Sequence, residues 1–185
     1  MFQIIEFDAS GTEIPGLRLI RMKQVIEDRG AVREFYRASA FAGVGIELPP
    51  FHQINVTETV PGAIRGMHAE PMTKVVAIAH GTAYGAWIDT RADSPTRGAV
   101  VQQVLQPGDQ VLVPEGVCNG FQSTSPSPTQ YIYCFTSEWV PGAGLAVSPL
   151  DPALGVRWPV EIDPADLSRL SHKDRSAPTL AQVLG

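Results

Sequence analysis

Short runs of strand-forming residues, separated by turns rich in glycine and proline, constrain the fold of this chain most strongly. Between residues 51 and 148 the sequence predicts strands at 53–57, 63–69, 74–80, 82–90, 99–105, 110–113, 119–123, 130–136 and 145–147. Turn sequences such as Val60-Pro61-Gly62, Pro107-Gly108-Asp109 and Pro114-Glu115-Gly116 lie between them. Because no part of this stretch has the period of a long amphipathic helix, the pattern predicts an all-β sandwich or barrel.

The two ends of the chain carry weaker signals. Strands are expected at 17–23 and 31–36, followed by a short helix at 37–42. After residue 148 the sequence predicts extended and turn segments, one helical turn from Pro164 and a second helix within 176–184. We find no internal repeat or low-complexity stretch, so we expect a single domain, residues 1–185, with N-terminal strands and short C-terminal helices.

Composition limits the possible partners. The net charge of -5 argues against a nucleic-acid-binding protein that relies on a broad basic face. No apolar run reaches membrane-spanning length, and the N-terminus lacks the features of a signal peptide. The two cysteines, Cys118 and Cys134, are too few and too far apart for a disulfide scaffold. We therefore expect a cytoplasmic protein with reduced thiols that binds neither nucleic acid nor membrane.

Arg65 and His68 stand out in the apolar strand predicted at 63–69. They are three residues apart, and an odd offset on a regular strand places side chains on opposite faces. A β-bulge at Gly66 would bring both side chains to the same face. A lone histidine near a strand end is more often structural than functional, so the strand alone leaves its role open.

The segment Gly108-x5-Pro114-x-Gly116 resembles the second cupin motif, with Asn119 where that motif has a histidine. In the segment that matches the first motif, His68 is the single imidazole. We therefore expect a cupin-type jelly-roll barrel without a metal site. A histidine inside such a barrel can act as a general base when a carboxylate orients it. Asp174 is the candidate carboxylate, although its spacing from His68 does not establish contact.

Several segments in a fixed order identify a family. They are Arg65-Gly66-Met67-His68, Lys74, Asp89-Thr90-Arg91, residues 94–98, 114–116 and 151–159, and Leu170-Ser171-His172-Lys173-Asp174. From about residue 15 to residue 182 the chain resembles the dTDP-4-dehydrorhamnose 3,5-epimerase family. The resemblance implies an isomerase that inverts carbons next to the ketone of a dTDP-4-keto-6-deoxyhexose, through an enolate and with no cofactor.

The resemblance also implies roles for individual residues. His68 is the expected base, Asp174 its partner, Tyr133 the acid and Lys74 the group that stabilises the enolate oxygen. A second set is expected to bind the substrate: Gln53 and Asn55 at the nucleotide, Arg65 at the diphosphate, and Asn119 and Trp139 at the active site. Trp139 stands where the family usually has a second active-site tyrosine. Taken alone, Tyr133 has the pattern of a core aromatic residue in a strand.

A neighbouring subunit completes the expected site. By resemblance, Arg29 and Glu34 contact the nucleotide that is bound to the next subunit, which implies a homodimer. Without the family, the same two residues would be interpreted as a charged turn and a solvated strand face. They lie in the segment Asp28-Arg29-Gly30-x-x-x-Glu34.

The sequence departs from the family at Asn119, which replaces a histidine, and at Gly85, which replaces an aspartate. The loop from His68 to Lys74 is also short for the family. These differences leave open the sugar and whether C3, C5 or both are inverted. They also keep three alternatives open: a non-catalytic sugar-nucleotide-binding protein on the same scaffold, a 3,4-ketoisomerase and a metal cupin.

Overall fold

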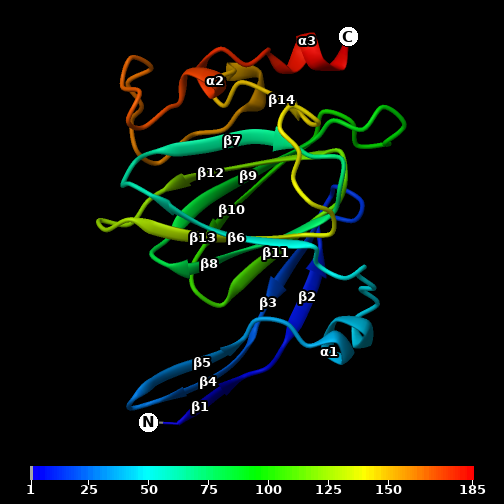
Figure 1. Cartoon of the computed structure of the whole chain (residues 1–185), viewed down its shortest axis with the longest axis vertical. Helices are drawn as coiled ribbons and strands as arrows, with labels where there is room; N and C mark the ends of the chain where they lie inside the picture. The colour runs from blue at the N-terminus through cyan, green and yellow to red at the C-terminus, as the bar shows by residue number, and fades with distance from the viewer. Residues whose placement is uncertain (1) are drawn as a thin grey trace.

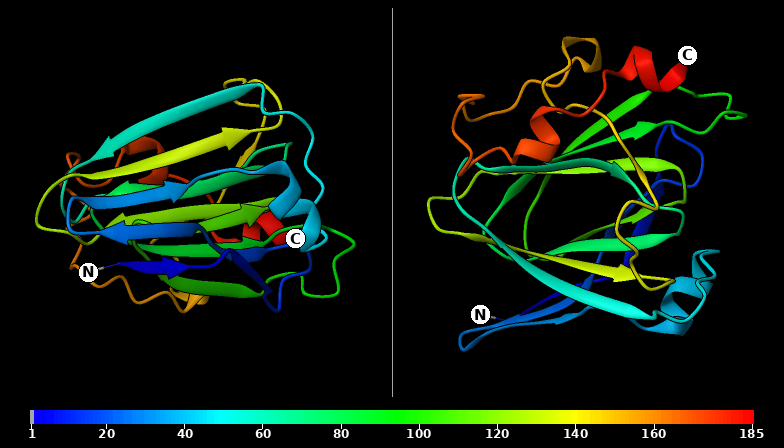
Figure 2. Two further views of the ribbon diagram at one scale, coloured as in Figure 1. Left: turned by 90° about the horizontal axis from the view of Figure 1, so that it is seen from below. Right: turned by 45° about the horizontal axis from the view of Figure 1, so that its top comes forward.

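Two antiparallel sheets face each other in a computed structural model that describes residues 2–185 (Figures 1 and 2). In spatial order the first sheet contains β10 (Val100–Leu105), β9 (Ala83–Asp89), β12 (Val117–Ser123), β7 (Ile64–Ala69) and β14 (Leu145–Ala146). The second contains β2 (Asp8–Gly11), β3 (Arg18–Arg21), β11 (Asp109–Val113), β8 (Lys74–His80), β13 (Thr129–Phe135) and β6 (Gln53–Thr59). The predicted all-β jelly-roll architecture is confirmed.

A third, small sheet projects from this barrel (Figure 1). It contains β1 (Gln3–Ile5), β4 (Lys23–Glu27) and β5 (Gly30–Glu34), and the short helix α1 (Ala38–Gly43) follows it. The prediction of one continuous strand at 17–23 is wrong. The chain leaves the barrel at Met22, so the residues before it belong to β3 and those after it to β4 of the small sheet. The Met22 N–H donates to Gly108 O at 2.8 Å, where the chain leaves the barrel. The short strands β1 and β2 were not predicted.

Alternation along the strands places buried side chains in three layers. The layer between the two sheets includes Trp87, Val111, Phe121 and Tyr131. Outside the five-stranded sheet, Met67, Ile88 and Cys118 pack against the C-terminal residues Val147, Leu154 and Leu180. Outside the six-stranded sheet, Val75, Leu112 and Cys134 pack against Phe41 of α1 and Ile46. Much of each sheet is therefore covered on both faces, which explains the nearly continuous apolar sequence of β8.

The C-terminal segment crosses the barrel with a 3₁₀ turn, η1 (Pro152–Leu154), and two short helices, α2 (His172–Arg175) and α3 (Leu180–Leu184). Helix α3 confirms the prediction within 176–184, and it begins with a capping box formed by Thr179 and Gln182. The helical turn predicted from Pro164 is wrong. There the Asp163 and Asp166 carboxylates accept backbone N–H groups two residues ahead and form turns instead. No helix in residues 2–185 is long and apolar enough to cross a membrane.

A β-bulge shapes the pairing of β7 with β12. His68 lies opposite Asn119 and Arg65 lies opposite Phe121, so three steps along β7 match two steps along β12. This extra residue confirms the predicted bulge, and it gives the side chains of Arg65 and His68 the same inner face. Gly66 within the bulge has φ +120°, and an added Cβ would stand 2.5 Å from Gly120 Cα of β12.

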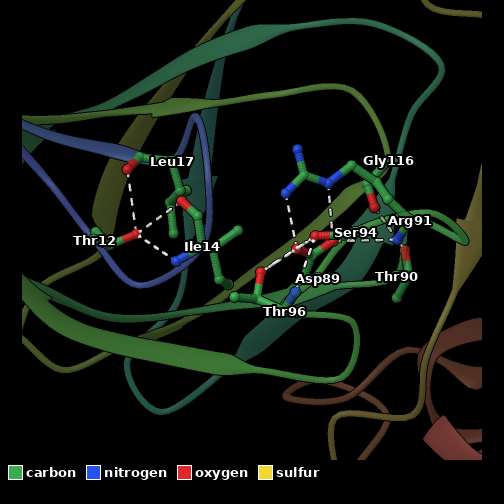
Figure 3. A network of polar contacts seen from close by, with 9 residues as sticks. All are labelled: Thr12, Ile14, Leu17, Asp89, Thr90, Arg91, Ser94, Thr96 and Gly116. Carbon is green, nitrogen blue, oxygen red and sulfur yellow. Dashed lines mark hydrogen bonds and ion pairs between the residues drawn. The ribbon is translucent and has the colours of Figure 1, made fainter.

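A polar network holds the loop after β9 against the barrel (Figure 3). The buried Asp89 carboxylate accepts hydrogen bonds from Arg91 Nε at 2.9 Å, Ser94 Oγ at 2.5 Å and Thr96 Oγ1 at 2.7 Å. Burial favours the neutral acid, but these hydrogen bonds outweigh it and hold the pKa of Asp89 well below its ordinary value. Elsewhere in the same view, the Thr12 hydroxyl donates to Leu17 O at 3.2 Å and closes the turn before β3.

We expect Asp89→Asn to lower the free energy of unfolding by about 3 kcal/mol at pH 7. The pKa of this group is lower in the folded than in the unfolded protein. Its stabilisation is therefore complete above the unfolded value of about 3.9 and decreases as the pH falls below it. Urea unfolding of wild type and variant should give a large difference at pH 7 and a smaller one at pH 3. The exposed Asp93→Asn is the control, and equal losses at both pH values would contradict the assignment.

We expect Gly66→Ala to lower the free energy of unfolding by about 2–4 kcal/mol. The new methyl group would collide with the backbone of β12, and an alanine rarely adopts this φ. Gly11→Ala is the matched control, because a Cβ at Gly11 of β2 meets no atom within 4 Å. Urea denaturation curves of the two variants should differ clearly, and equal stabilities would show that the bulge tolerates a side chain.

Candidate active site

A cavity of about 570 Å³ lies between the two sheets. Strands β6, β8 and β13 contribute to one wall, and β7 and β12 to the other. The C-terminal segment from Leu167 to Asp174 forms a third side. Residues of the predicted site that line the cavity are Asn55, Arg65, His68, Lys74, Asn119, Tyr133, Trp139 and Asp174.

His68 and Asp174 meet at this cavity. His68 Nε2 lies 2.7 Å from Asp174 Oδ1, and the side chains are 31% and 6% exposed. An ionised carboxylate only accepts hydrogen bonds, so in the neutral imidazole Nε2 carries the proton and Nδ1 is the basic nitrogen. This is the arrangement of an oriented general base.

The C-terminal segment holds Asp174 in place. Leu170 forms a parallel bridge with Ile64 of β7, and Ile64 N–H donates to Arg169 O at 2.8 Å. Ser171 then caps α2, with its hydroxyl accepting from Asp174 N–H at 3.1 Å. These contacts anchor α2 beside β7 and direct a buried carboxylate at His68.

Tyr133 lies on the opposite sheet, in the middle of β13, where it pairs with Asn55 of β6. Burial raises the pKa of the Tyr133 hydroxyl, and the negative charge of Glu70 adds to the shift. The phenol therefore remains protonated at neutral pH and can donate a proton. His68 and Tyr133 thus approach the cavity from facing sheets.

Lys74 is almost fully buried at the start of β8, with 2% of its side chain exposed. Its ammonium group donates to the Glu70 carboxylate and, at 3.3 Å, to the backbone carbonyl of His68. Burial lowers the pKa of Lys74, and the charge of Glu70 opposes that shift. Glu70 was not predicted as a site residue. The available signal was a carboxylate four residues before the lysine, in the loop that joins β7 to β8.

The expected nucleotide residues gather at the edge formed by β6. Arg65 donates through Nε to Thr59 Oγ1 at 2.7 Å and through Nη2 to Glu58 O at 3.1 Å. Gln53 does not line the cavity, but it donates to Asn55 Oδ1 at 3.1 Å and accepts from the backbone N–H of Trp139 at 2.8 Å. It therefore contacts two cavity residues and holds them together.

Arg29 and Glu34 lie far from the cavity of their own chain, on the hairpin formed by β4 and β5 (Figure 1). The Arg29 side chain is 86% exposed and pairs with Glu27, while Glu34 pairs with Arg37. Other cavity residues were missed by the sequence analysis, notably Arg169, Ser171 and Lys173 near Asp174. The only signal in the sequence was that these residues lie close to Asp174 along the chain.

Comparison with known proteins identifies the family of this chain. The family model described as dTDP-4-dehydrorhamnose 3,5-epimerase matches residues 11–182. A dTDP-4-dehydro-6-deoxyglucose 3-epimerase of Streptomyces bikiniensis is 31% identical over 84% of this chain and 80% of its own length. NovW of Streptomyces spheroides, a 4-keto-6-deoxy sugar epimerase, superposes with a TM-score of 0.87 at 27% identity, covering 97% of this chain and 90% of NovW.

A further structure contains a sugar nucleotide. The epimerase RmlC of Legionella pneumophila, in complex with dTDP-4-keto-L-rhamnose, superposes with a TM-score of 0.84 at 28% identity. The superposition covers 97% of each chain. With the family model spanning nearly the whole sequence, this chain belongs to the dTDP-4-dehydrorhamnose 3,5-epimerase family.

Proposed function

We propose that this protein epimerises a dTDP-4-keto-6-deoxyhexose at C3, at C5 or at both carbons. The observation that carries the proposal is the carboxylate-bound His68 on one sheet with protonated Tyr133 on the facing sheet. Inversion needs a proton removed from one face of the ring and another returned to the opposite face. Two groups of these types on opposite walls of a cavity suit that task.

The chemistry uses the side chains in sequence. His68 Nδ1 accepts the proton from a carbon next to the ketone, and Asp174 stabilises the imidazolium that forms. The electrons move to the ketone oxygen and give an enolate, whose charge Lys74 offsets. Tyr133 then delivers its proton to the carbon from the other side. Exchange with solvent returns both residues to their starting protonation states.

The remaining cavity residues suit a nucleotide diphosphate. Arg65 at the cavity edge supplies a guanidinium for the diphosphate. Asn55 supplies an amide, and the half-exposed Trp139 ring supplies an aromatic surface for stacking. The sugar nucleotide bound to the Legionella relative supports this choice of substrate.

Membership of the family favours epimerisation over the other functions that the sequence left open. Gly85 and Asn119 motivated a non-catalytic binding protein, but the oriented base and the protonated acid are both retained. A 3,4-ketoisomerase would use similar proton transfers, and the relatives compared above carry epimerase names instead. No metal is needed for the proposed steps.

Incubation with dTDP-4-keto-6-deoxyglucose in D2O should introduce deuterium at C3, C5 or both, as read by proton NMR. We expect His68→Asn to reduce this exchange by at least about a thousandfold, because it removes the base. Asp174→Asn should reduce it by about a hundredfold or more through loss of orientation. Binding of dTDP measured by calorimetry is the control for folding. Absence of exchange in the wild type, or full activity in His68→Asn, would overturn the proposal.

Tyr133→Phe should separate proton removal from inversion. The variant retains His68 and Asp174, so deuterium should still enter from the face of the base. Without the phenol, the rate of proton delivery to the opposite face of the sugar ring should fall by about 10²–10⁴-fold. NMR of the product therefore should show labelled sugar of unchanged configuration. Equal loss of exchange and inversion would assign Tyr133 a different role.

We propose that two copies of the chain form a homodimer in which Arg29 and Glu34 reach the nucleotide of the partner subunit. Both residues stand on a hairpin that projects from the barrel and away from its own cavity. The outer face of the edge strand β6 exposes Ile54 and Val56, 61% and 63% exposed, and Val32 on the hairpin is 69% exposed. Apolar surface on an edge strand and on a projecting hairpin is suited to burial against a second copy.

Mixing two inactive variants tests this arrangement. Arg29→Ala and His68→Asn homodimers should each have low activity. A heterodimer would contain one site with His68 from one chain and Arg29 from the other. After subunit exchange at equal concentrations, about a quarter of wild-type activity should return, because half of the dimers have one complete site. Sedimentation equilibrium should report a dimer. A monomer, or no recovery after proven exchange, would contradict the shared site.

A further inference from the structure

Asn119 occupies the centre of a row of side chains on the inner face of the five-stranded sheet. It pairs in register with His68 of β7 on one side and with Trp87 of β9 on the other. Directly paired residues in an antiparallel sheet place their side chains next to each other. Asn119 is only 4% exposed, yet it lines the cavity. It is therefore the cavity residue of β12 that stands beside the base.

Two donors determine the orientation of the Asn119 amide. Trp87 Nε1–H donates to Asn119 Oδ1 at 2.9 Å, and the Tyr131 hydroxyl donates to the same oxygen at 3.3 Å. An indole N–H cannot accept a hydrogen bond, so the amide group facing Trp87 must be the oxygen. The amide nitrogen then lies on the opposite side. Both side-chain hydrogen bonds of Asn119 use Oδ1, so Nδ2 has no partner within residues 2–185. It is also absent from the buried side-chain atoms that lack a partner in this part of the chain, so Nδ2 is accessible.

Gly85 allows Trp87 to hold this position. The two residues share the inner face of β9, and a Cβ at Gly85 would stand 2.4 Å from Trp87 Cη2. The indole therefore lies over the glycine, in space that any side chain at residue 85 would occupy. The two departures from the family pattern are thus linked in space, because Gly85 accommodates the ring whose N–H holds Asn119.

Tyr131 is fixed just as firmly. Its ring stacks on Phe121 with the centroids 4.0 Å apart and the planes at 3°. The side chain is fully buried, and burial raises the pKa of its hydroxyl well above the ordinary value, so the group remains a donor. Both partners of Asn119 Oδ1 are therefore rigid aromatic residues of the core.

We propose that Trp87 and Tyr131 are positioning residues that aim the Asn119 amide N–H at the keto oxygen of the bound sugar. This inference rests on the proposed function, since it adds a second donor, besides Lys74, for the enolate formed by His68. An amide takes up no proton at neutral pH. Asn119 can therefore stabilise the negative charge of the enolate without acting as a second base next to His68. Both residues line the cavity, but the Lys74 ammonium already donates to Glu70 and the His68 carbonyl, whereas Asn119 Nδ2 donates to no group within residues 2–185.

Asn119→Asp tests the donor with little change in shape. The variant retains an oxygen for Trp87 and Tyr131 but replaces the N–H groups with a second oxygen. Loss of one such donor lowers kcat by about 10²–10³-fold in comparable sites, and we expect a fall of that size. The affinity for dTDP, which lacks the sugar, should change by less than about twofold. Wild-type kcat in Asn119→Asp would overturn the proposal.

Trp87→Phe tests positioning. It removes the donor to Asn119 without touching the substrate, and we expect kcat to fall about tenfold with little change in KM. If Trp87 acts through Asn119, this loss should disappear when Asn119→Asp is already present. A role in packing alone would lower activity equally in both backgrounds and would overturn the inference. Trp158→Phe is the matched control, because it removes an indole hydrogen bond to Pro149 O outside the cavity.

A binding experiment gives an answer independent of turnover. In ¹⁵N-labelled protein the Asn119 side-chain amide signal is identified by its absence from Asn119→Asp. Addition of dTDP-glucose should shift this signal, whereas dTDP should leave it nearly unchanged. No shift with either ligand would overturn the inference, even if the wild type exchanges protons. A shift in a protein without exchange would support the sugar contact and reject the proposed epimerase function.

Discussion

The pairing of β7 with β12 is the interaction on which the whole site depends. The bulge at Gly66 gives Arg65 and His68 a common face, and the register places Asn119 beside His68. Close contact of Gly66 with the backbone of Gly120 leaves no room for a side chain at this point. One local irregularity in an otherwise regular sheet therefore determines where the proposed base, diphosphate anchor and amide donor lie.

Packing on the outer faces of the two sheets supports the site. The C-terminal segment packs on the outer face of the five-stranded sheet through Val147, Leu154 and Leu180, and it also delivers Asp174 to His68. The same segment thus covers an apolar surface and completes a polar pair. The packing of the C-terminal segment and the orientation of the His68 imidazole are consequently coupled. If the segment detached from the sheet, the Asp174 carboxylate would move away from His68 as well.

Charge is distributed unevenly around the cavity. The buried Lys74 pairs with Glu70 near His68, and Tyr133 is kept protonated by burial and by the negative charge of Glu70. A carboxylate at this position therefore acts on two proposed catalytic groups at once. It holds the ammonium group of Lys74 and favours the protonated phenol of Tyr133. Asn119, Trp87 and Tyr131 are uncharged and contribute dipoles rather than charges.

The sequence by itself determined the barrel strands from β6 to β14, the bulge and some of the residues that line the cavity. Strand periodicity and turn residues are local properties, so they can be recognised in the sequence without knowledge of the fold. The family motifs can also be recognised there, because they occur in a fixed order along the chain. Only the tertiary structure decided which of these residues meet. His68 and Asp174 are 106 positions apart, and Trp87 and Asn119 are 32 apart, so their contacts follow from sheet register and chain packing. Glu70 and the division of residues 17–23 between two sheets were missed for the same reason, because neither follows from local periodicity.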